Sequence, residues 1–227
     1  MIGSPRVHHR LTDSTNERAK ELGAAGAPHG TLVTADEQSA GRGRQGRVWT
    51  APPRSAVLMS LVLRELDELL PLSAAVAVCE ALPAEARIKW PNDIWIEDRK
   101  VAGILVEGRP QEGWAVLGIG LNVTTGEFPP ELAEIATSLR LSGVETDTES
   151  VLGALLGSLS EWLGAPPEAV LAAWRERDAL RGERIGWSGG EGIADGIDDS
   201  GALLVQTGDG LVTLDAGEVH LERRPGA

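Results

Sequence analysis

The sequence predicts an α+β domain followed by a small all-β domain, and three observations lead to this prediction. Strand-like apolar runs alternate with stretches of helical spacing over residues 1–180. From about Arg181 the pattern changes to short alternating strands separated by glycine and aspartate turns. The chain has 227 residues, of which 42% are hydrophobic, so it can bury a sizeable core. We therefore expect a larger domain over 1–180 and a β-barrel over 181–227.

The first half of the larger domain is expected to start with a short helix in "DSTNERAKELG". Ser14 and Glu17 have the spacing of a capping box, and the helix should end near Gly23–Gly26. Strands are expected in "TLVTADEQ" and in "SAVLMSLVLR", whose almost continuous apolar character is typical of a strand covered on both faces. Residues 66–82 then show helical spacing.

The second half of this domain is expected to hold four consecutive, largely antiparallel strands and then two helices. The strands are "RIKW", "DIWIE", "KVAGILVEGR" and "GWAVLGIGLNV", and turn-forming segments separate the first three. The helices should span about 148–163 and 167–180. Pro166 and Pro167 lie between them, where proline can begin a helix.

Composition excludes several classes of function. The formal net charge of −13 makes sequence-independent binding of nucleic acid unexpected, because such binding needs a basic face. The single cysteine, Cys79, lies in an apolar helical stretch, which indicates a buried, inert thiol and no disulfide within the chain. No apolar run reaches the length of a membrane span and no signal-peptide core is present, so we expect a cytoplasmic protein.

Positive charge is concentrated in "GRGRQGR", residues 41–47. Glycines allow a backbone to fold closely around a ligand, and arginines bind phosphate or carboxylate through planar donors. The segment is neither a Walker loop nor a Rossmann turn, because no Gly-Lys-Ser/Thr ends it and it does not open an apolar helix. Composition alone leaves two interpretations, an anion-binding loop and a mobile surface loop.

A second candidate segment is "KWPNDIWIEDRKVAGILVEG", residues 89–108, which contains two of the three lysines, Lys89 and Lys100. Lys89 is expected at the end of a strand, where an exposed lysine is common. Asn92 and Asp93 also suit a simple turn. The glycines of the neighbouring strands either leave room for a ligand or allow close packing. These glycines are Gly103, Gly118 and Gly120.

Together, "STN", "QSAGRGRQGRVW", "KWPNDIWIEDRKVAGILVEG" and "GIGLNV" resemble the motifs of biotin protein ligases in order and spacing, over residues 10–125. Residues 181–227 resemble the small SH3-like C-terminal domain of that family in texture alone. The resemblance implies a catalytic domain like that of class II aminoacyl-tRNA synthetases, with a mixed, mainly antiparallel sheet. About ten residues precede the first motif, so the helix-turn-helix domain of some members, and with it DNA binding, is not expected.

The resemblance implies a two-step reaction. Biotin and ATP give biotinyl-5′-AMP and pyrophosphate, and biotin is then transferred to one lysine of a biotin carboxyl carrier domain. The implied partner is therefore the carrier domain of an acetyl- or acyl-CoA carboxylase or of another biotin-dependent carboxylase. Biotin and ATP are substrates, Mg²⁺ assists, and no cofactor is permanently bound. The protein itself is expected to be a monomer or a homodimer.

The same resemblance assigns roles to individual residues. Those implied to bind biotin are Ser14, Thr15, Asn16, Gln38, Arg42, Gly43, Arg44 and Lys89. Within this set the implied catalytic residues are Lys89, which would bridge the carboxylate and the α-phosphate, Arg42 and Arg44. Those implied to contact the nucleotide are Arg47, Trp49, Asn92, Lys100 and Asn122. Asp93 either helps to hold Mg²⁺ or only shapes its turn.

Two other functions fit parts of the same pattern. A lipoate ligase or octanoyltransferase would share the fold and the carrier-lysine target. A non-enzymatic biotin or nucleotide sensor would share the pocket, but it would not need the phosphate-directed charge of Lys89 and the three arginines of residues 41–47. The histidines, His8, His9, His29 and His220, lie outside the motifs and receive no role.

Overall fold

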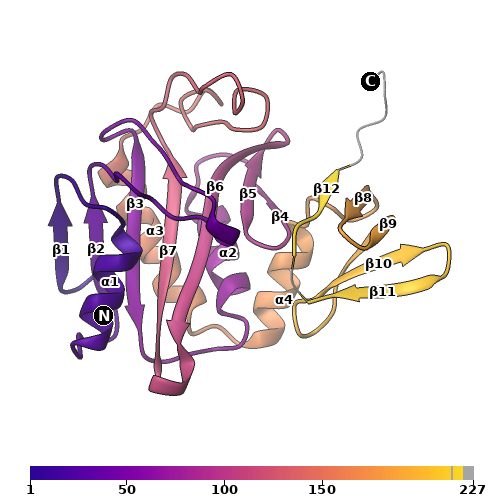
Figure 1. The fold of residues 1–227 in the computed structure, drawn as a ribbon, viewed down its shortest axis with the longest axis horizontal. Coiled ribbons are helices and arrows are strands. Elements are labelled where there is room, and N and C mark those ends of the chain that lie inside the picture. The colour runs from indigo at the N-terminus through magenta and orange to yellow at the C-terminus, as the bar shows by residue number, and fades with distance from the viewer. Residues whose placement is uncertain (216, 222–227) are drawn as a thin grey trace.

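The computed structural model describes residues 1–215 and 217–221 and contains two β-sheets (Figure 1). The larger sheet has seven strands in the order β1-β2-β3-β7-β6-β5-β4. Its strands are β1 (Arg6–His9), β2 (Thr31–Ala35), β3 (Ala56–Leu63), β4 (Arg87–Lys89), β5 (Asp93–Ile96), β6 (Arg99–Arg109) and β7 (Trp114–Asn122). β1 pairs with β2 in parallel and all other neighbours are antiparallel. The predicted α+β class and the mixed, mainly antiparallel sheet are confirmed.

Helices cover both faces of this sheet (Figure 1). α1 (Thr15–Ala24) lies on one face, where Ala19 packs with Val33, Val62 and Trp114. The opposite face carries α2 (Leu70–Ala81) and α3 (Thr148–Trp162), and α4 (Pro167–Glu176) packs against α2. Because α1 is short, it covers only part of its face, and the remaining surface of β6 and β7 forms the floor of a pocket.

Two local predictions were wrong, and one strand was not predicted. The capping box does not form: Ser14 is the extended N-cap of α1, but its side chain makes no capping hydrogen bond. Glu17 instead lies 2.7 Å from the Lys20 ammonium group. α4 ends before residue 180 because the following segment turns to pair with β4, where the Ile88 amide donates to the Arg177 carbonyl at 2.7 Å. Strand β1 was not expected, since its four residues are largely exposed and carry no apolar alternation.

The smaller sheet is antiparallel, in the order β11-β10-β9-β8-β12. Its strands are β8 (Arg184–Trp187), β9 (Gly190–Ile197), β10 (Leu203–Thr207), β11 (Gly210–Leu214) and β12 (His220–Leu221). These match the predicted all-β segment, of which residues 222–227 lie outside the described residues.

The two sheets share one hydrophobic core. Leu203 and Val205 of the smaller sheet belong to the same buried cluster as Leu72 and Trp90 of the larger unit. The Trp90 indole N–H also donates to the Gly201 carbonyl at 3.1 Å. A division into independent domains at residue 180 therefore stays a prediction.

Cys79 is buried in α2 with 6% of its surface exposed, as expected. Burial raises the pKa of its thiol to about 12, which keeps it protonated and unreactive near neutral pH. Among the helices that the structure describes, none is long and apolar enough to span a membrane.

Candidate active site

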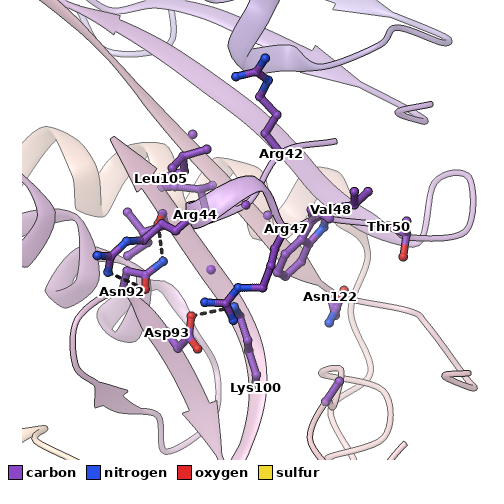
Figure 2. A pocket seen from close by; sticks show the side chains of 18 of the residues that line it. Arg42, Arg44, Arg47, Val48, Thr50, Asn92, Asp93, Lys100, Leu105 and Asn122 are labelled. Atoms are coloured by element: carbon purple, nitrogen blue, oxygen red, sulfur yellow. Dashed lines mark hydrogen bonds and ion pairs between the residues drawn. The ribbon is translucent and has the colours of Figure 1, made fainter. Parts of the chain in front are cut away.

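A pocket of about 660 Å³ opens on the face of the larger sheet that carries α1, beneath residues 41–49 (Figure 2). Every residue that the sequence analysis selected lines it. These residues are Ser14, Thr15, Asn16, Gln38, Arg42, Gly43, Arg44, Arg47, Trp49, Lys89, Asn92, Asp93, Lys100 and Asn122. Four motifs that are far apart in the sequence therefore meet in one cavity.

One end of the pocket is a set of polar groups at the start of α1. The buried Ser60 hydroxyl lies 2.8 Å from Thr15 Oγ1 and 2.6 Å from Asn16 Oδ1. Gln38 Oε1 accepts hydrogen bonds from the Thr15 amide at 2.7 Å and from the Thr15 hydroxyl at 3.0 Å. These mutual contacts hold the hydrogen-bond donors and acceptors in fixed orientations. Such a site can recognise a polar ligand by the arrangement of its own hydrogen-bonding groups.

The other end is cationic. Arg44, Arg47, Lys89 and Lys100 gather there near Asp93, and the pocket lining also includes the carboxylates of Asp98 and Glu218. The Lys100 ammonium group lies 2.6 Å from Asp93 Oδ1 (Figure 2). The four cations outnumber the three carboxylates of the lining by one, so this end is locally positive and can attract anions although the whole chain is acidic.

The turn between β4 and β5 holds this cationic end in position. Lys89 pairs with Asp93 in the register of the two strands. Between them, Asn92 accepts a hydrogen bond from Arg44 Nη1 at 3.3 Å and donates one to the Ile104 carbonyl at 2.7 Å. The "PND" segment is therefore a turn, and it also fixes the direction of one arginine.

Burial affects the two cations nearest to this turn. Burial lowers the pKa of Lys89, with Asp93 opposing this effect and Lys100 and Arg47 adding to it. Burial also lowers the pKa of Arg44. Cations that have lost part of their hydration act strongly on a bound anion, since the surrounding medium screens them less than water does.

The strand glycines make room for protein side chains that line the pocket. A Cβ atom on Gly118 would collide with the Asn16 carboxamide, and one on Gly120 would lie 2.5 Å from the Trp49 indole. On Gly103 it would lie 3.1 Å from Lys100 Cε and 3.2 Å from the Trp49 ring. The sequence left two interpretations of these glycines, space for a ligand and close packing of strands. The structure shows a third role, space for protein side chains that line the pocket.

These clashes predict that an alanine at Gly118 and an alanine at Gly120 lower ligand affinity at different ends of the pocket. Gly118→Ala should displace Asn16 and weaken the ligand at the polar end, whereas Gly120→Ala should displace Trp49 and weaken the ligand beside the indole. Overpacking of this kind costs about 1–3 kcal/mol, or roughly tenfold in affinity. Calorimetry with each ligand separately checks the pair. Gly126→Ala, which has open space around its added methyl group, is the control.

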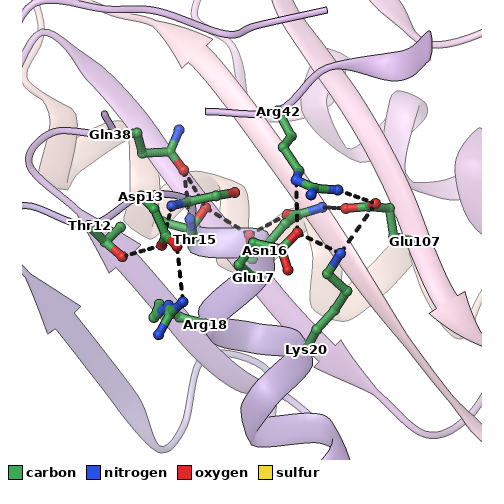
Figure 3. Close-up of polar contacts among 12 residues, drawn as sticks. Thr12, Asp13, Thr15, Asn16, Glu17, Arg18, Lys20, Gln38, Arg42 and Glu107 are labelled. Carbon is green, nitrogen blue, oxygen red and sulfur yellow. Dashed lines mark hydrogen bonds and ion pairs between the residues drawn. The ribbon is translucent and has the colours of Figure 1, made fainter. Parts of the chain in front are cut away.

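Residues 41–49 form a small hairpin over the pocket. The Gly43 amide donates to the Arg47 carbonyl at 2.8 Å, and the Trp49 amide donates to the Gly41 carbonyl at 3.0 Å. Gln45, at its tip, has a φ of 56°. The guanidinium of Arg42 leaves the pocket and lies 2.8 Å from Glu17 and 3.4 Å from Glu107 (Figure 3). Arg42 is thus tied to carboxylates in this structure.

Two walls of the pocket were not predicted from the sequence. One is formed by Phe128, Leu132, Ile135 and Ala136, from the segment between β7 and α3. The other comes from the smaller sheet and consists of Glu218, His220 and Leu221. Glu218 forms an ion pair with Arg47. The only phenylalanine of the chain was an available signal for the first wall, whereas nothing local marks Glu218.

The described residues do not by themselves form a metal site. No group of three or more His, Cys, Asp or Glu side chains within residues 1–215 and 217–221 is arranged to hold an ion. Asp93 has a partner in Lys100, which accounts for its position without a metal.

Comparison with known proteins agrees with this geometry. Residues 8–123 match the model of the biotin/lipoate A/B protein ligase family, and residues 190–221 match that of the biotin protein ligase C-terminal domain. The chain is 37% identical over 235 residues to the biotin–[acetyl-CoA-carboxylase] ligase of Mycobacterium tuberculosis, covering 92% of this chain and 86% of that protein. It is 36% identical over 244 residues to the bifunctional ligase/repressor BirA of Bacillus subtilis, covering 97% and 75%.

A solved structure gives the same result. The biotin protein ligase from Aquifex aeolicus in complex with biotin and ATP superposes with a TM-score of 0.85 and 29% identity, over 97% of this chain and 100% of that one. The motifs that meet in the pocket fall within the matched segment, and the similarity extends through both sheets. The chain therefore belongs to the biotin/lipoate A/B protein ligase family.

Proposed function

We propose that the protein is a biotin protein ligase that forms biotinyl-5′-AMP and transfers biotin to a lysine of a carrier domain. The observation that carries this proposal is the order of environments along one pocket: polar groups, an apolar floor and a cationic end. Biotin presents a ureido head, an aliphatic chain and a carboxylate in the same order. The named ligase relatives and the similar structure that holds biotin and ATP support it.

The polar end suits the ureido head, which both donates and accepts hydrogen bonds. Thr15, Asn16 and Gln38 supply groups of both kinds. The apolar side chains next to them suit the fused rings and the valeryl chain. These side chains are Leu58 and Leu105, whereas Met59, Ile104 and Ile119 line the pocket with their backbone, because their side chains belong to the core on the other face of the sheet.

The cationic end suits the first step. A biotin carboxylate oxygen attacks the α-phosphorus of ATP, and the bond from that phosphorus to pyrophosphate breaks. A carboxylate is already ionised near neutral pH, so the obstacle is repulsion between two anions and no base is needed. Fixed, partly desolvated cations lower this repulsion most in the transition state, where the two anions are closest.

Lys100 is the lysine best placed to touch the reacting groups. Its ammonium group lies 5.6 Å from the centroid of the Trp49 ring, beside Gly103 on the pocket floor. Lys89 instead lies over Trp95, also at 5.6 Å, on the edge strand β4. We therefore place Lys100 at the carboxylate and the α-phosphate, and Lys89 as a second cation that strengthens the field. This exchanges the positions that the sequence resemblance implied.

Two buried polar atoms suit a nucleotide beyond this cationic end. Asn122 Oδ1 and the Trp49 indole nitrogen have no hydrogen-bond partner among the residues described. Asn122 donates its Nδ2 to the Thr137 carbonyl at 3.1 Å, so its oxygen is held toward the pocket side. The Asn122 oxygen could accept a hydrogen bond from the exocyclic amine of adenine, and the Trp49 indole could stack on the adenine ring.

Mg²⁺ would enter with ATP and neutralise phosphate charge, since the described residues do not build a separate site for it. In the second step the acceptor lysine amine attacks the biotinyl carbon and AMP leaves. The carrier domain of a biotin-dependent carboxylase remains the proposed acceptor. The monomeric or dimeric state, the absence of DNA binding and the cytoplasmic location remain predictions from the sequence.

Pyrophosphate exchange into ATP tests this function and separates the alternatives. With biotin the exchange should be fast, and with lipoate or octanoate it should stay at background. Biotin transfer to a purified carrier domain should follow, and an acceptor whose target lysine is replaced by arginine should remain unlabelled. Exchange with lipoate alone would identify a lipoate ligase, and biotin binding without exchange would identify a sensor.

A further inference from the structure

A network of polar and charged side chains joins the polar end of the pocket to the hairpin that covers it, and Glu107 contacts three of its members, Asn16, Lys20 and Arg42 (Figure 3). Glu107 lies on β6, and 26% of its side chain is exposed. The motifs of the sequence analysis gave it no role, and it does not line the pocket.

The two oxygens of the Glu107 carboxylate serve different partners. Oε2 accepts a hydrogen bond from Asn16 Nδ2 at 2.9 Å. Oε1 lies 3.4 Å from both Lys20 Nζ and Arg42 Nη1. Burial alone would raise the pKa of Glu107, but the Asn16 hydrogen bond and the charges of Lys20 and Arg42 hold it below its usual range. The carboxylate is therefore ionised at neutral pH and accepts on both sides.

The contact with Asn16 fixes the direction of a carboxamide at the polar end. Asn16 Oδ1 lies 2.6 Å from the Ser60 hydroxyl, and Nδ2 faces Glu107. An amide that turned over would put its donors against Ser60 and its acceptor against a carboxylate, which is unfavourable. Nδ2 carries two hydrogens, so one remains for a ligand after Glu107 has accepted the other.

We propose that Glu107 is a positioning residue that couples substrate recognition to closure of the hairpin, because one carboxylate orients Asn16 and anchors Arg42. The inference deepens the proposed function and rests on it for the identity of the ligand, biotin. Arg42 then holds the hairpin from outside, and Arg44 and Arg47 act inside the pocket.

Glu107→Gln tests the proposal, because a carboxamide has one acceptor oxygen where a carboxylate has two. If that oxygen faces Lys20 and Arg42, an NH₂ group meets Asn16 Nδ2. If it faces Asn16, the two cations lose this partner and keep only Glu17. We expect the KM for biotin to rise roughly tenfold or more, as for loss of a hydrogen bond to a charged group. The KM for ATP should stay unchanged, and amide hydrogen exchange over residues 41–49 should become faster.

Three further variants separate positioning from a general loss of charge or stability. Glu21→Gln removes an exposed carboxylate from α1, where it pairs with Arg18, and should match wild type. Glu17→Gln removes the other partner of Arg42 but does not touch Asn16, so it should speed exchange in the hairpin more than it raises the KM for biotin. In an Arg42→Gln background, Glu107→Gln should still raise the KM for biotin but should add little to the exchange rate.

The outcomes distinguish this inference from the proposed function. If wild type shows no biotin-dependent pyrophosphate exchange, the proposed function fails. The coupling is then still tested by the hydrogen exchange of residues 41–49 in Glu107→Gln, which needs no activity. If wild type is active and Glu107→Gln changes the KM values for biotin and ATP equally, or leaves hairpin exchange at the wild-type rate, Glu107 does not couple the two parts and the inference is overturned.

Discussion

Lys100→Gln is expected to lower the rate of biotinyl-5′-AMP formation by at least about a hundredfold, the loss typical of removing one group that stabilises transition-state charge. Lys100 lies on the pocket floor between Trp49 and Asp93 and supplies its charge where two anions meet. The rate should fall more than the affinity for biotin, because the charge is needed most when the phosphorus is attacked. Pyrophosphate exchange measures the rate, and calorimetry measures biotin affinity.

Lys89→Gln is the matched comparison, since it removes the same charge from the other side of Asp93. We expect a substantial but smaller loss of rate, and a change in the pH profile. Burial lowers the pKa of Lys89, so its ammonium group loses its proton at a pH below the usual value for lysine. The wild-type rate should therefore decline as pH rises through that lowered pKa, and this decline should be missing from Lys89→Gln. Near-normal exchange in Lys100→Gln would contradict the placement of that lysine.

Arg44→Gly is expected to release the adenylate that the wild-type enzyme retains. Arg44 is anchored to Asn92 and points into the cationic end, so it should donate charge-assisted hydrogen bonds to the intermediate. Each such bond is worth roughly 1.5–3 kcal/mol, and a loss of about 2.7 kcal/mol is a hundredfold in affinity. Most of that loss should appear as faster dissociation. The released mixed anhydride should then acylate lysines on unrelated proteins.

The measurement is incubation of each enzyme with biotin, ATP and serum albumin, followed by detection of biotin on the albumin. Arg54→Gly is a suitable control. Arg54 is an exposed arginine that does not line the pocket, and its φ of 61° already suits glycine. If Arg44→Gly consumes ATP but labels albumin no more than the control does, Arg44 does not retain the intermediate.

Features encoded over short stretches of sequence were predictable. Apolar β3 and the four strands from β4 to β7 followed from runs and turn residues, and the pocket residues followed from motifs that resemble one family. The failures involve contacts between distant parts of the chain. Glu17 fits a capping box by spacing, but its carboxylate pairs with Lys20 on the same helix and with Arg42 of the hairpin, and the second contact comes from another part of the chain.

The role of Glu107 was not predicted because it depends on residues that are far away in the sequence. It is separated by 91 residues from Asn16 and by 65 from Arg42, and only the pairing of β6 with β7 and the packing of α1 bring them together. Glu218 reaches the pocket from the smaller sheet in the same way. Glu107 lies inside the segment 89–108 that resembles the family motif, but nothing within that segment gives it a role, and no local pattern marks Glu218.

The core shared by the two sheets limits how the enzyme can open. A hinge that swung the smaller sheet away would expose Trp90, Leu203 and Val205, which are almost completely buried, and would break the bond from Trp90 to Gly201. Burial of each such side chain is worth about 1.5–3 kcal/mol, so a rigid-body opening of this kind is rarely populated. We therefore expect substrates to enter by movement of the segments that border the pocket outside the smaller sheet, residues 41–49 and 128–136, and the carrier domain to approach a rim that does not move on the side of that sheet.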